Sequence, residues 1–223
     1  MFQYYNENTS RSDDLFELIS SQKWRKLKVY IPKNKNIAEA YHAQCTGTSI
    51  LNVNKCLYHC NSRHNALLYA CYFHPPLEVV KCLYYAYPKA IQDQDCKGCF
   101  PLHIACSNGC KPEVIKFLIQ QYPQAMWETD VNNRNPIFHV CKSYASKSNK
   151  RCKKTANKDL YAVLELLGSF APMSFITEDK CGKTPLDYLI TAEAHPLVVD
   201  YVRSIYVHLR REMIKGGKNK QEV

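Results

Sequence analysis

The chain is poor in glycine and has no long apolar run. Only 7 of its 223 residues are glycine, and most of them stand at turn positions rather than in a phosphate-binding loop. No nucleophile elbow and no recognisable frame of paired carboxylates is present. No stretch approaches the roughly 18 to 20 unbroken apolar residues of a membrane span. We therefore expect a non-enzymatic protein that has no catalytic residues, needs no cofactor and does not cross a membrane.

A secretion signal is also missing, because the first residues contain no basic start followed by an apolar run. The protein is therefore expected inside the cell, in the cytoplasm or the nucleus. In such a reducing compartment, its 12 cysteines would be free thiols or metal ligands rather than a disulfide framework. The apolar fraction of 46% is sufficient for a folded chain that buries a core.

Positive charge exceeds negative charge by 10, and it is concentrated in clusters. Residues 22–36 and 142–158 hold many basic residues and no acid, and the tail after residue 202 is also basic. Such clusters attract anionic partners, although they are equally typical of solvated loops. The cluster at 142–158 indicates an alternative function, which is the binding of a nucleic acid or of an acidic partner, and it could also be a nuclear localisation signal. Nucleic-acid binding is not favoured, because the cluster lacks aromatic residues interleaved for base stacking. Its candidate anion-binding residues are Lys147, Lys150, Arg151, Lys153 and Lys154.

An internal repeat organises most of the chain. The segment that begins at His64 recurs 35 residues later at Cys99, with matching apolar positions and a Tyr-Pro pair near the end of each copy. A third copy follows at the same spacing, with Pro136 35 residues after Pro101, and a fourth begins at Thr184. Pro185 follows Pro136 by 49 residues, so 14 extra residues are inserted into the third copy, within the basic cluster.

Each copy has the same physical plan of a turn, a short helix, a loop and a second helix. Glycine or asparagine recurs at one turn position, which predicts a positive φ there: Gly98, Asn133 and Gly182. Proline then recurs where a helix begins, since its missing N–H costs nothing at that position: Pro101, Pro136 and Pro185. The second helix of a copy is expected over 112–121, where Tyr122-Pro123 ends it. No copy alone could bury its apolar face, so the copies should stack.

This pattern resembles the ankyrin repeat family, whose T-P-L-H-x-A signature is matched by PLHIA at Pro101–Ala105 and by TPL at Thr184–Leu186. The Tyr-Pro ending is similar to variant repeats expanded in some unicellular algae. The family histidine survives only as His103 and the family threonine only as Thr184. The resemblance covers about residues 65–213. It implies an all-α fold, an α-solenoid of stacked helix-turn-helix repeats with short hairpin turns.

The expected organisation has three parts. Residues 1–64 form a helical cap with Ser12 as a candidate N-cap, followed by an irregular hairpin region. Residues 65–213 hold the repeats, at about 65–99, 100–134, 135–183 with the basic insertion 142–158, and 184–213. A last helix from Leu197 to about Arg211 should cap the stack, with Tyr201, Ile205 and Leu209 facing inward. Residues 214–223 are expected to be a disordered tail.

The cysteines divide into two kinds. Cys71, Cys106 and Cys141 are equivalent in three copies, with Ile190 in the fourth, so this position is expected to be a buried apolar slot. Cys96 and Cys99 are not required by the repeat, and we expect both in an exposed turn before a helix. Cys96 and Cys99 leave a zinc- or redox-responsive function as a second alternative, but His103 and Cys106 should point into the stack, away from the turn, so we expect no bound metal. A second metal candidate is the cluster of Cys56, His59, Cys60 and His64.

The resemblance implies a protein-interaction module, a scaffold or adaptor that binds another protein through its turn tips and the concave face of its first helices. The expected partner is a protein whose identity the sequence does not give, and the chain itself is expected to be a monomer. Candidate partner-binding residues are those at variable places of the repeat that are expected to be exposed: Tyr72, Phe73, Gln94, Lys97, Ser107, Asn108, Val131 and Asn132.

Overall fold

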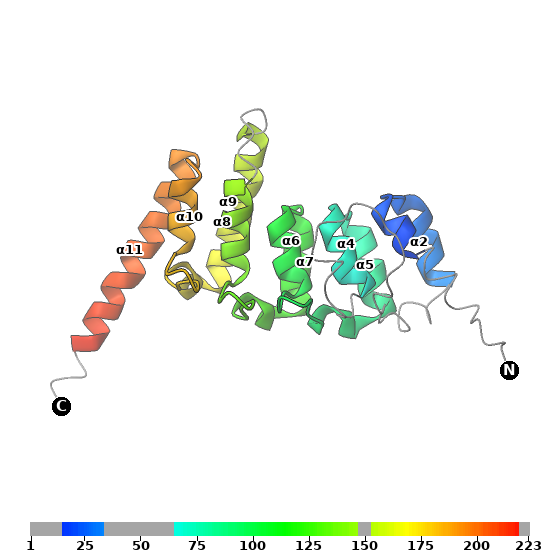
Figure 1. Cartoon of the computed structure of the whole chain (residues 1–223), viewed down its shortest axis with the longest axis horizontal. Coiled ribbons are helices and arrows are strands. Elements are labelled where there is room, and N and C mark those ends of the chain that lie inside the picture. The colour runs from blue at the N-terminus through cyan, green and yellow to red at the C-terminus, as the bar shows by residue number, and fades with distance from the viewer. Residues whose placement is uncertain (1–14, 34–64, 147–152, 219–223) are drawn as a thin grey trace. The chain divides into compact units, whose positions relative to one another are not determined.

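The computed structural model describes residues 15–33, 65–146 and 153–218, and all regular structure in these ranges is helical (Figure 1). The all-α fold is therefore confirmed for the described part of the chain. The chain divides into two compact units, Met1–Tyr122 and Pro123–Val223, which are taken separately below. Among the described helices, none combines the length and the apolar character that crossing a bilayer requires.

The first unit begins with a two-helix cap. Residues 15–20 are helical, Gln22 has a positive φ of 54° in the turn that follows, and α2 spans Trp24–Lys33. The inner face of α2, with Leu27 and Ile31 buried, packs against α5, which spans Leu77–Ala86. The candidate N-cap Ser12 and the predicted hairpin region over 34–64 lie outside the described residues.

Two helix pairs follow in the first unit and lie side by side (Figure 1). The first pair is α4 (Ala66–Ala70), which continues into the 3-10 turn η1 (Cys71–Phe73), and α5, followed by η2 (Pro88–Gln92). The second pair is α6 (Pro101–Asn108) and α7 (Pro112–Gln121). Both second helices end immediately before the Tyr-Pro pair, as the sequence predicts.

The second unit starts with η3 (Pro123–Met126) and contains α8 (Pro136–Ser146), α9 (Lys153–Phe170), η4 (Pro172–Phe175), α10 (Pro185–Thr191) and α11 (Pro196–Lys218). The insertion lengthens the helices of the third copy. Helix α8 has 11 residues against 8 in α6, and α9 has 18 against 10 in α7. Three further residues in the connection between α8 and α9 complete the 14 extra residues, so the repeat resumes in register at Pro172.

The turns and helix starts follow from the recurring glycine, asparagine and proline residues. Gly98, Asn133 and Gly182 have φ values of 73°, 61° and 70°, which confirms the predicted left-handed position in each turn. Pro101, Pro136 and Pro185 are the first residues of α6, α8 and α10. Local chemistry therefore sets where each copy turns and where its first helix begins.

The repeat position that holds cysteine is buried in the first three copies and exposed in the fourth. Cys71, Cys106 and Cys141 are at most 2% exposed, as predicted. Ile190, by contrast, is 49% exposed, so the prediction of a buried slot is wrong for the last copy. Helix α10 packs against α8 and α11, and no described helix of a following copy covers the side that carries Ile190.

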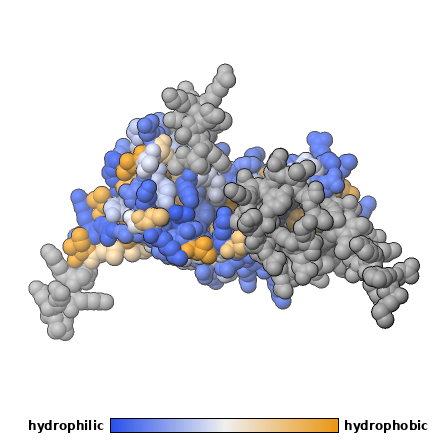
Figure 2. Space-filling view, in the orientation of Figure 1, coloured by the Kyte–Doolittle hydropathy of each residue, from blue (hydrophilic) through white to orange (hydrophobic). Residues whose placement is uncertain are grey.

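Helix α11 is the last described helix of the second unit, and its exposed surface carries apolar residues such as Leu197, Met213 and Ile214 beside polar ones (Figure 2). Arg203 is exposed and paired with Asp200 at 2.9 Å. Val198 and Val202 are buried, whereas the predicted inward residues Tyr201, Ile205 and Leu209 are only half-buried. The helix runs to Lys218, so residues 214–218 are not part of a disordered tail, and residues 219–223 lie outside the described range.

Close packing in the second unit depends on one helical glycine. A Cβ at Gly168 of α9 would lie 2.7 Å from a ring carbon of Phe175, which is fully buried in η4. Such a contact is shorter than van der Waals packing permits, so the close approach of α9 to η4 requires glycine at this position.

Candidate functional site

The turn of the first unit is held by a buried aspartate. One carboxylate oxygen of Asp95 accepts hydrogen bonds from the backbone N–H groups of Lys97 and Cys99, both at 2.8 Å. The backbone N–H of Asp95 donates to the carbonyl of Cys99 at 3.0 Å, which closes the turn. The other carboxylate oxygen accepts a hydrogen bond from the Tyr72 hydroxyl at 3.3 Å. This turn therefore fixes its backbone and presents Gln94, Cys96 and Lys97 to solvent.

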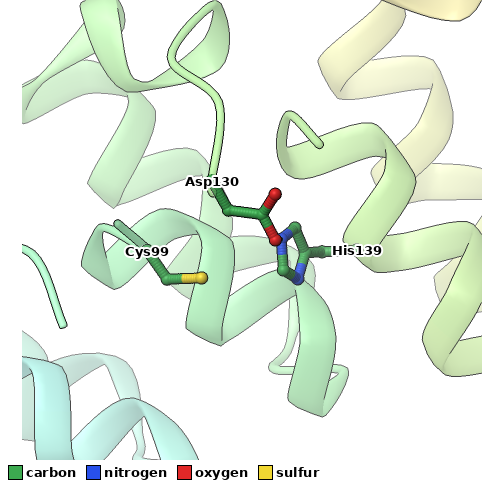
Figure 3. Close-up of side chains that lie close together, drawn as sticks. All are labelled: Cys99, Asp130 and His139. Carbon is green, nitrogen blue, oxygen red and sulfur yellow. The ribbon is translucent and has the colours of Figure 1, made fainter. Parts of the chain in front are cut away.

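Asp130 repeats the arrangement at the first turn of the second unit. Its carboxylate accepts hydrogen bonds from the backbone N–H groups of Asn132 at 2.8 Å and Arg134 at 3.0 Å. The second oxygen faces the imidazole of His139 on α8, with the Nε2 atom at 3.3 Å (Figure 3). Burial by itself would raise the pKa of Asp130, but the neighbouring His139 imidazole and the backbone hydrogen bonds outweigh it and hold that pKa well below its usual range.

Asp179 repeats the arrangement again and adds an ion pair. The backbone N–H groups of Cys181 and Lys183 donate to one oxygen at 2.8 and 3.1 Å. The other oxygen accepts a hydrogen bond from the Tyr188 hydroxyl at 2.7 Å and one from the Arg134 guanidinium at 3.0 Å. Burial would raise the pKa of Asp179, but the bonds from Tyr188, the backbone and Arg134 lower it to about 2.

The two turns of the second unit form one continuous edge. The backbone N–H of Lys180 donates to the carbonyl of Asn132 at 3.0 Å, and the Asn133 amide donates to the carbonyl of Glu178 at 2.7 Å. We call this surface the tip edge. Its exposed side chains are Val131, Asn133, Glu178, Lys180, Cys181 and Lys183. Since its backbone is fixed by hydrogen bonds, the tip edge can bind a partner with little loss of conformational entropy.

Some of the residues predicted to bind a partner occupy such exposed positions. Gln94 and Lys97 are exposed at the turn of the first unit. Val131 is 51% exposed at the tip edge, an apolar side chain open to solvent. Asn132 lies beside it but is half-buried, because its backbone joins the two turns.

The four predicted residues on the first helices are half-buried rather than exposed. Tyr72 bonds to the turn aspartate, and the Phe73 ring lies 5.1 Å from that of Tyr69. The Asn108 amide donates to the carbonyl of Ile104 at 2.9 Å, one turn back in α6, and Ser107 precedes it. These contacts contribute to their burial, and η1, which carries Tyr72 and Phe73, also packs against α6 of the next copy. Their role in binding stays a prediction.

The third turn tip is absent from the residues that the sequence predicts to bind a partner. Lys180, Cys181 and Lys183 are exposed at the turn that begins with Asp179. The signal that identifies them is the spacing from that aspartate to Gly182, which is the same as from Asp95 to Gly98.

The basic insertion is mostly outside the described residues. Lys147, Lys150 and Arg151 fall in the undescribed connection between α8 and α9. Lys153 and Lys154 belong to the first turn of α9, but their side chains are not described. The candidate anion-binding role of these residues therefore stays a prediction.

The cysteine pair of the first unit does not form a shared exposed site. Cys96 is exposed, but Cys99 is 2% exposed, so the expectation that both thiols lie in an exposed turn is wrong. The backbone of Cys99 closes the turn on Asp95 and takes its side chain inward. The second metal candidate, Cys56 with His59, Cys60 and His64, lies outside the described residues.

The thiols of Cys71, Cys106 and Cys110 and the imidazole of His103 are buried in the first unit. The Cys110 thiol lies 3.5 Å from the carbonyl of Cys71. Burial raises the pKa of Cys71 well above its usual value, and the nearby thiols of Cys110 and Cys106 raise it further, so this thiol is neutral and apolar in character. The fully buried His103 accepts a hydrogen bond from the backbone N–H of Phe100 at 3.4 Å, at the start of α6.

Comparison with known families agrees with this architecture. A family model described as ankyrin repeats, in three copies, matches the chain over residues 35–135 and 67–204. These overlapping matches together cover most of the chain and include the turns at Asp95, Asp130 and Asp179. No curated protein matches the chain.

Proposed function

Since the chain belongs to the ankyrin repeat family, we propose that it is a non-enzymatic scaffold or adaptor that binds another protein through its turn tips. Ankyrin repeats are generally protein-interaction modules, and members of the family are typically not enzymes. The observation that supports the turn tips here is the tip edge of the second unit. Its backbone is fixed by hydrogen bonds, while its side chains remain exposed.

The chemistry of the tips suits recognition rather than catalysis. The aspartates that begin the turns have their carboxylate oxygens bound by backbone N–H groups and side chains, so they serve to hold the turn. The buried thiol of Cys141 has a pKa raised by burial, as that of Cys71 does, which removes its nucleophilic character at neutral pH. What the tips offer to a partner is a set of exposed polar and basic side chains around Val131.

The test is affinity capture from a native lysate, with and without nuclease. The tip variant carries Gln94→Ala, Lys97→Ala and Val131→Ala. A matched control carries Gln120→Ala, Lys116→Ala and Leu197→Ala, which remove the same kinds of side chain from exposed helix positions. We expect the wild type and the control to capture the same proteins and the tip variant to lose them. Because all six side chains are exposed or at turn tips, both variants should keep their unfolding free energy within about 0.5 kcal/mol.

Two results contradict the proposal. If the tip variant captures the same proteins as the wild type, the turn tips are not the binding surface. If nuclease releases all captured material, the partner is a nucleic acid, which would favour the alternative function of the basic insertion.

A further inference from the structure

Helix α2 lies at the N-terminal end of the first unit (Figure 1). It has one buried side and one strongly basic side. Leu27 and Ile31 are buried against α5, while Trp24 and Tyr30 flank them and are half-buried. The opposite side is exposed and carries the four cations of the helix together with one apolar residue. We call it the basic face, and it consists of Arg25, Lys26, Lys28, Val29 and Lys33.

The cations of the basic face have no acidic partner in the described part of the chain, whereas several cations elsewhere have one. The one acid of residues 15–33, Glu17, lies 3.8 Å from Lys23, which precedes α2. On α11 the situation differs, because three cations are paired. Arg203 lies 2.9 Å from Asp200, Arg210 lies 3.5 Å from Glu178, and Lys215 lies 2.9 Å from Glu212. The positive field at α2 is therefore not neutralised by the described residues.

The basic face also contains an exposed apolar centre. Val29 is 57% exposed, and Arg25 and Lys33 stand one helical turn on either side of it. A single exposed valine is ordinary on a protein surface, but Val29 stands in the middle of the four cations of the helix. A ligand that offers carboxylates around an apolar side chain would complement both features.

A nucleic acid complements this face less well. Binding of single strands relies on aromatic side chains on which bases stack, and the two aromatics of α2 lie beside its buried side rather than on the basic face. An acidic segment of a protein supplies carboxylates and apolar groups together. The charge and the exposed valine therefore favour a protein ligand.

We propose that the basic face of α2 binds an acidic segment of a partner protein. Its carboxylates pair with Arg25, Lys26, Lys28 and Lys33, and one of its apolar side chains covers Val29. This surface is separate from the turn tips and does not depend on the function proposed for them.

The test uses fluorescence anisotropy of the full chain with three labelled probes. The first is a glutamate-rich peptide with leucines four positions apart, the second is the same peptide with serine in place of leucine, and the third is an oligothymidylate of equal charge. We expect the leucine peptide to bind most tightly. Raising the salt from about 50 mM to about 300 mM should weaken it, because exposed ion pairs are screened.

Two variants with the same change in net charge locate the site. The face variant carries Arg25→Gln, Lys26→Gln, Lys28→Gln and Lys33→Gln, and glutamine keeps the helix propensity of these positions. The control carries Lys89→Gln, Lys111→Gln, Lys116→Gln and Arg211→Gln, all at exposed sites elsewhere. The face variant should bind the leucine peptide at least about tenfold more weakly, and the control should bind it as the wild type does. Val29→Ser should remove the preference for leucine over serine.

Three results overturn the proposal. Equal losses in both variants mean that net charge alone attracts the peptide. Tighter binding of the oligothymidylate, lost in the face variant, means that the surface is a nucleic-acid site. Absence of binding to the leucine peptide at low salt means that the basic face is only solvated. Circular dichroism of each variant shows that a loss of binding is not a loss of helix.

Discussion

The turn at Asp95 and the turn at Asp179 have the same backbone and different side-chain partners. In both, the aspartate accepts two backbone hydrogen bonds, and a glycine three positions later has a positive φ. The second carboxylate oxygen of Asp95 is bound by a neutral tyrosine at 3.3 Å, whereas that of Asp179 is bound by a tyrosine at 2.7 Å and by the Arg134 guanidinium. The repeat therefore fixes the shape of the turn, and the neighbouring side chains set how strongly it is held.

This difference has an electrostatic cause. The side chain of Asp179 is fully buried and that of Arg134 is 12% exposed, so each charge depends on the other for its stability. Arg134 belongs to the preceding turn, at the position that Cys99 occupies one copy earlier. One substitution within the repeat thus links two consecutive turns of the second unit.

The largest expected effect is that of Asp179→Ala. It leaves the Arg134 guanidinium buried without its carboxylate and two backbone N–H groups without an acceptor, so we expect a loss of about 3 to 5 kcal/mol in unfolding free energy. Asp95→Ala removes backbone acceptors and a tyrosine contact, for which about 1 to 2 kcal/mol is expected. Urea unfolding of the three proteins measures both losses.

Adding Arg134→Met to Asp179→Ala separates the two contributions. If the unpaired charge causes most of the loss, the double variant should recover part of it. Equal losses for Asp95→Ala and Asp179→Ala, with no recovery in the double variant, would mean that the backbone of the turn matters and the ion pair does not. Asp179→Asn is the milder substitute if the alanine variant does not fold.

The next largest expected effect is a fall in unfolding free energy at acidic pH, caused by protonation of Asp179. The pKa of Asp179 is lowered to about 2 from an ordinary value of 3.8, so the carboxylate stabilises the folded state above that ordinary value. This stability is lost as the pH falls through about 4 towards about 2, and it amounts to about 1 to 2 kcal/mol. Asp179→Asn should show a smaller fall in unfolding free energy over this range, measured by urea unfolding at each pH.

Part of the acid dependence should remain in that variant. Asp130, next to His139, also has a lowered pKa and contributes in the same direction. A wild-type profile that matches the Asp179→Asn profile over the whole range would contradict the role assigned to Asp179.

The smallest effects concern the two tyrosines. Tyr188→Phe should cost about 1 kcal/mol, because its hydroxyl donates a short hydrogen bond to a buried carboxylate. Tyr72→Phe should cost about 0.5 kcal/mol, because its hydrogen bond is longer. Thermal unfolding measures both, with Tyr85→Phe as the control, since that side chain is exposed and should give no change. A larger loss for Tyr72→Phe than for Tyr188→Phe would reverse the ranking of the two turns.

Much of the fold could be predicted because the residues that set each turn and each helix start lie within the turn or helix that they shape. Gly98, Asn133 and Gly182 have the positive φ that their positions required, and Pro101, Pro136 and Pro185 begin their helices. The site was less predictable, because exposure depends on neighbours that are distant in sequence. Cys99 was expected at the surface and is buried, and Tyr72 was expected to be open to a partner and instead bonds to Asp95.

By itself, the sequence determined the period of the repeat and the family that it resembles. It also determined the turns and the residues at which α6, α8 and α10 begin, because these follow from backbone chemistry at each position. Positions that match in the repeat need not have the same surroundings, and only the tertiary structure decided which of them are buried. Cys106 and Ile190 occupy the same place in the repeat, yet one is buried and the other is open at the last copy. Whether a residue is buried and whether its charge is paired depend on what packs against it, and the local sequence does not contain that information.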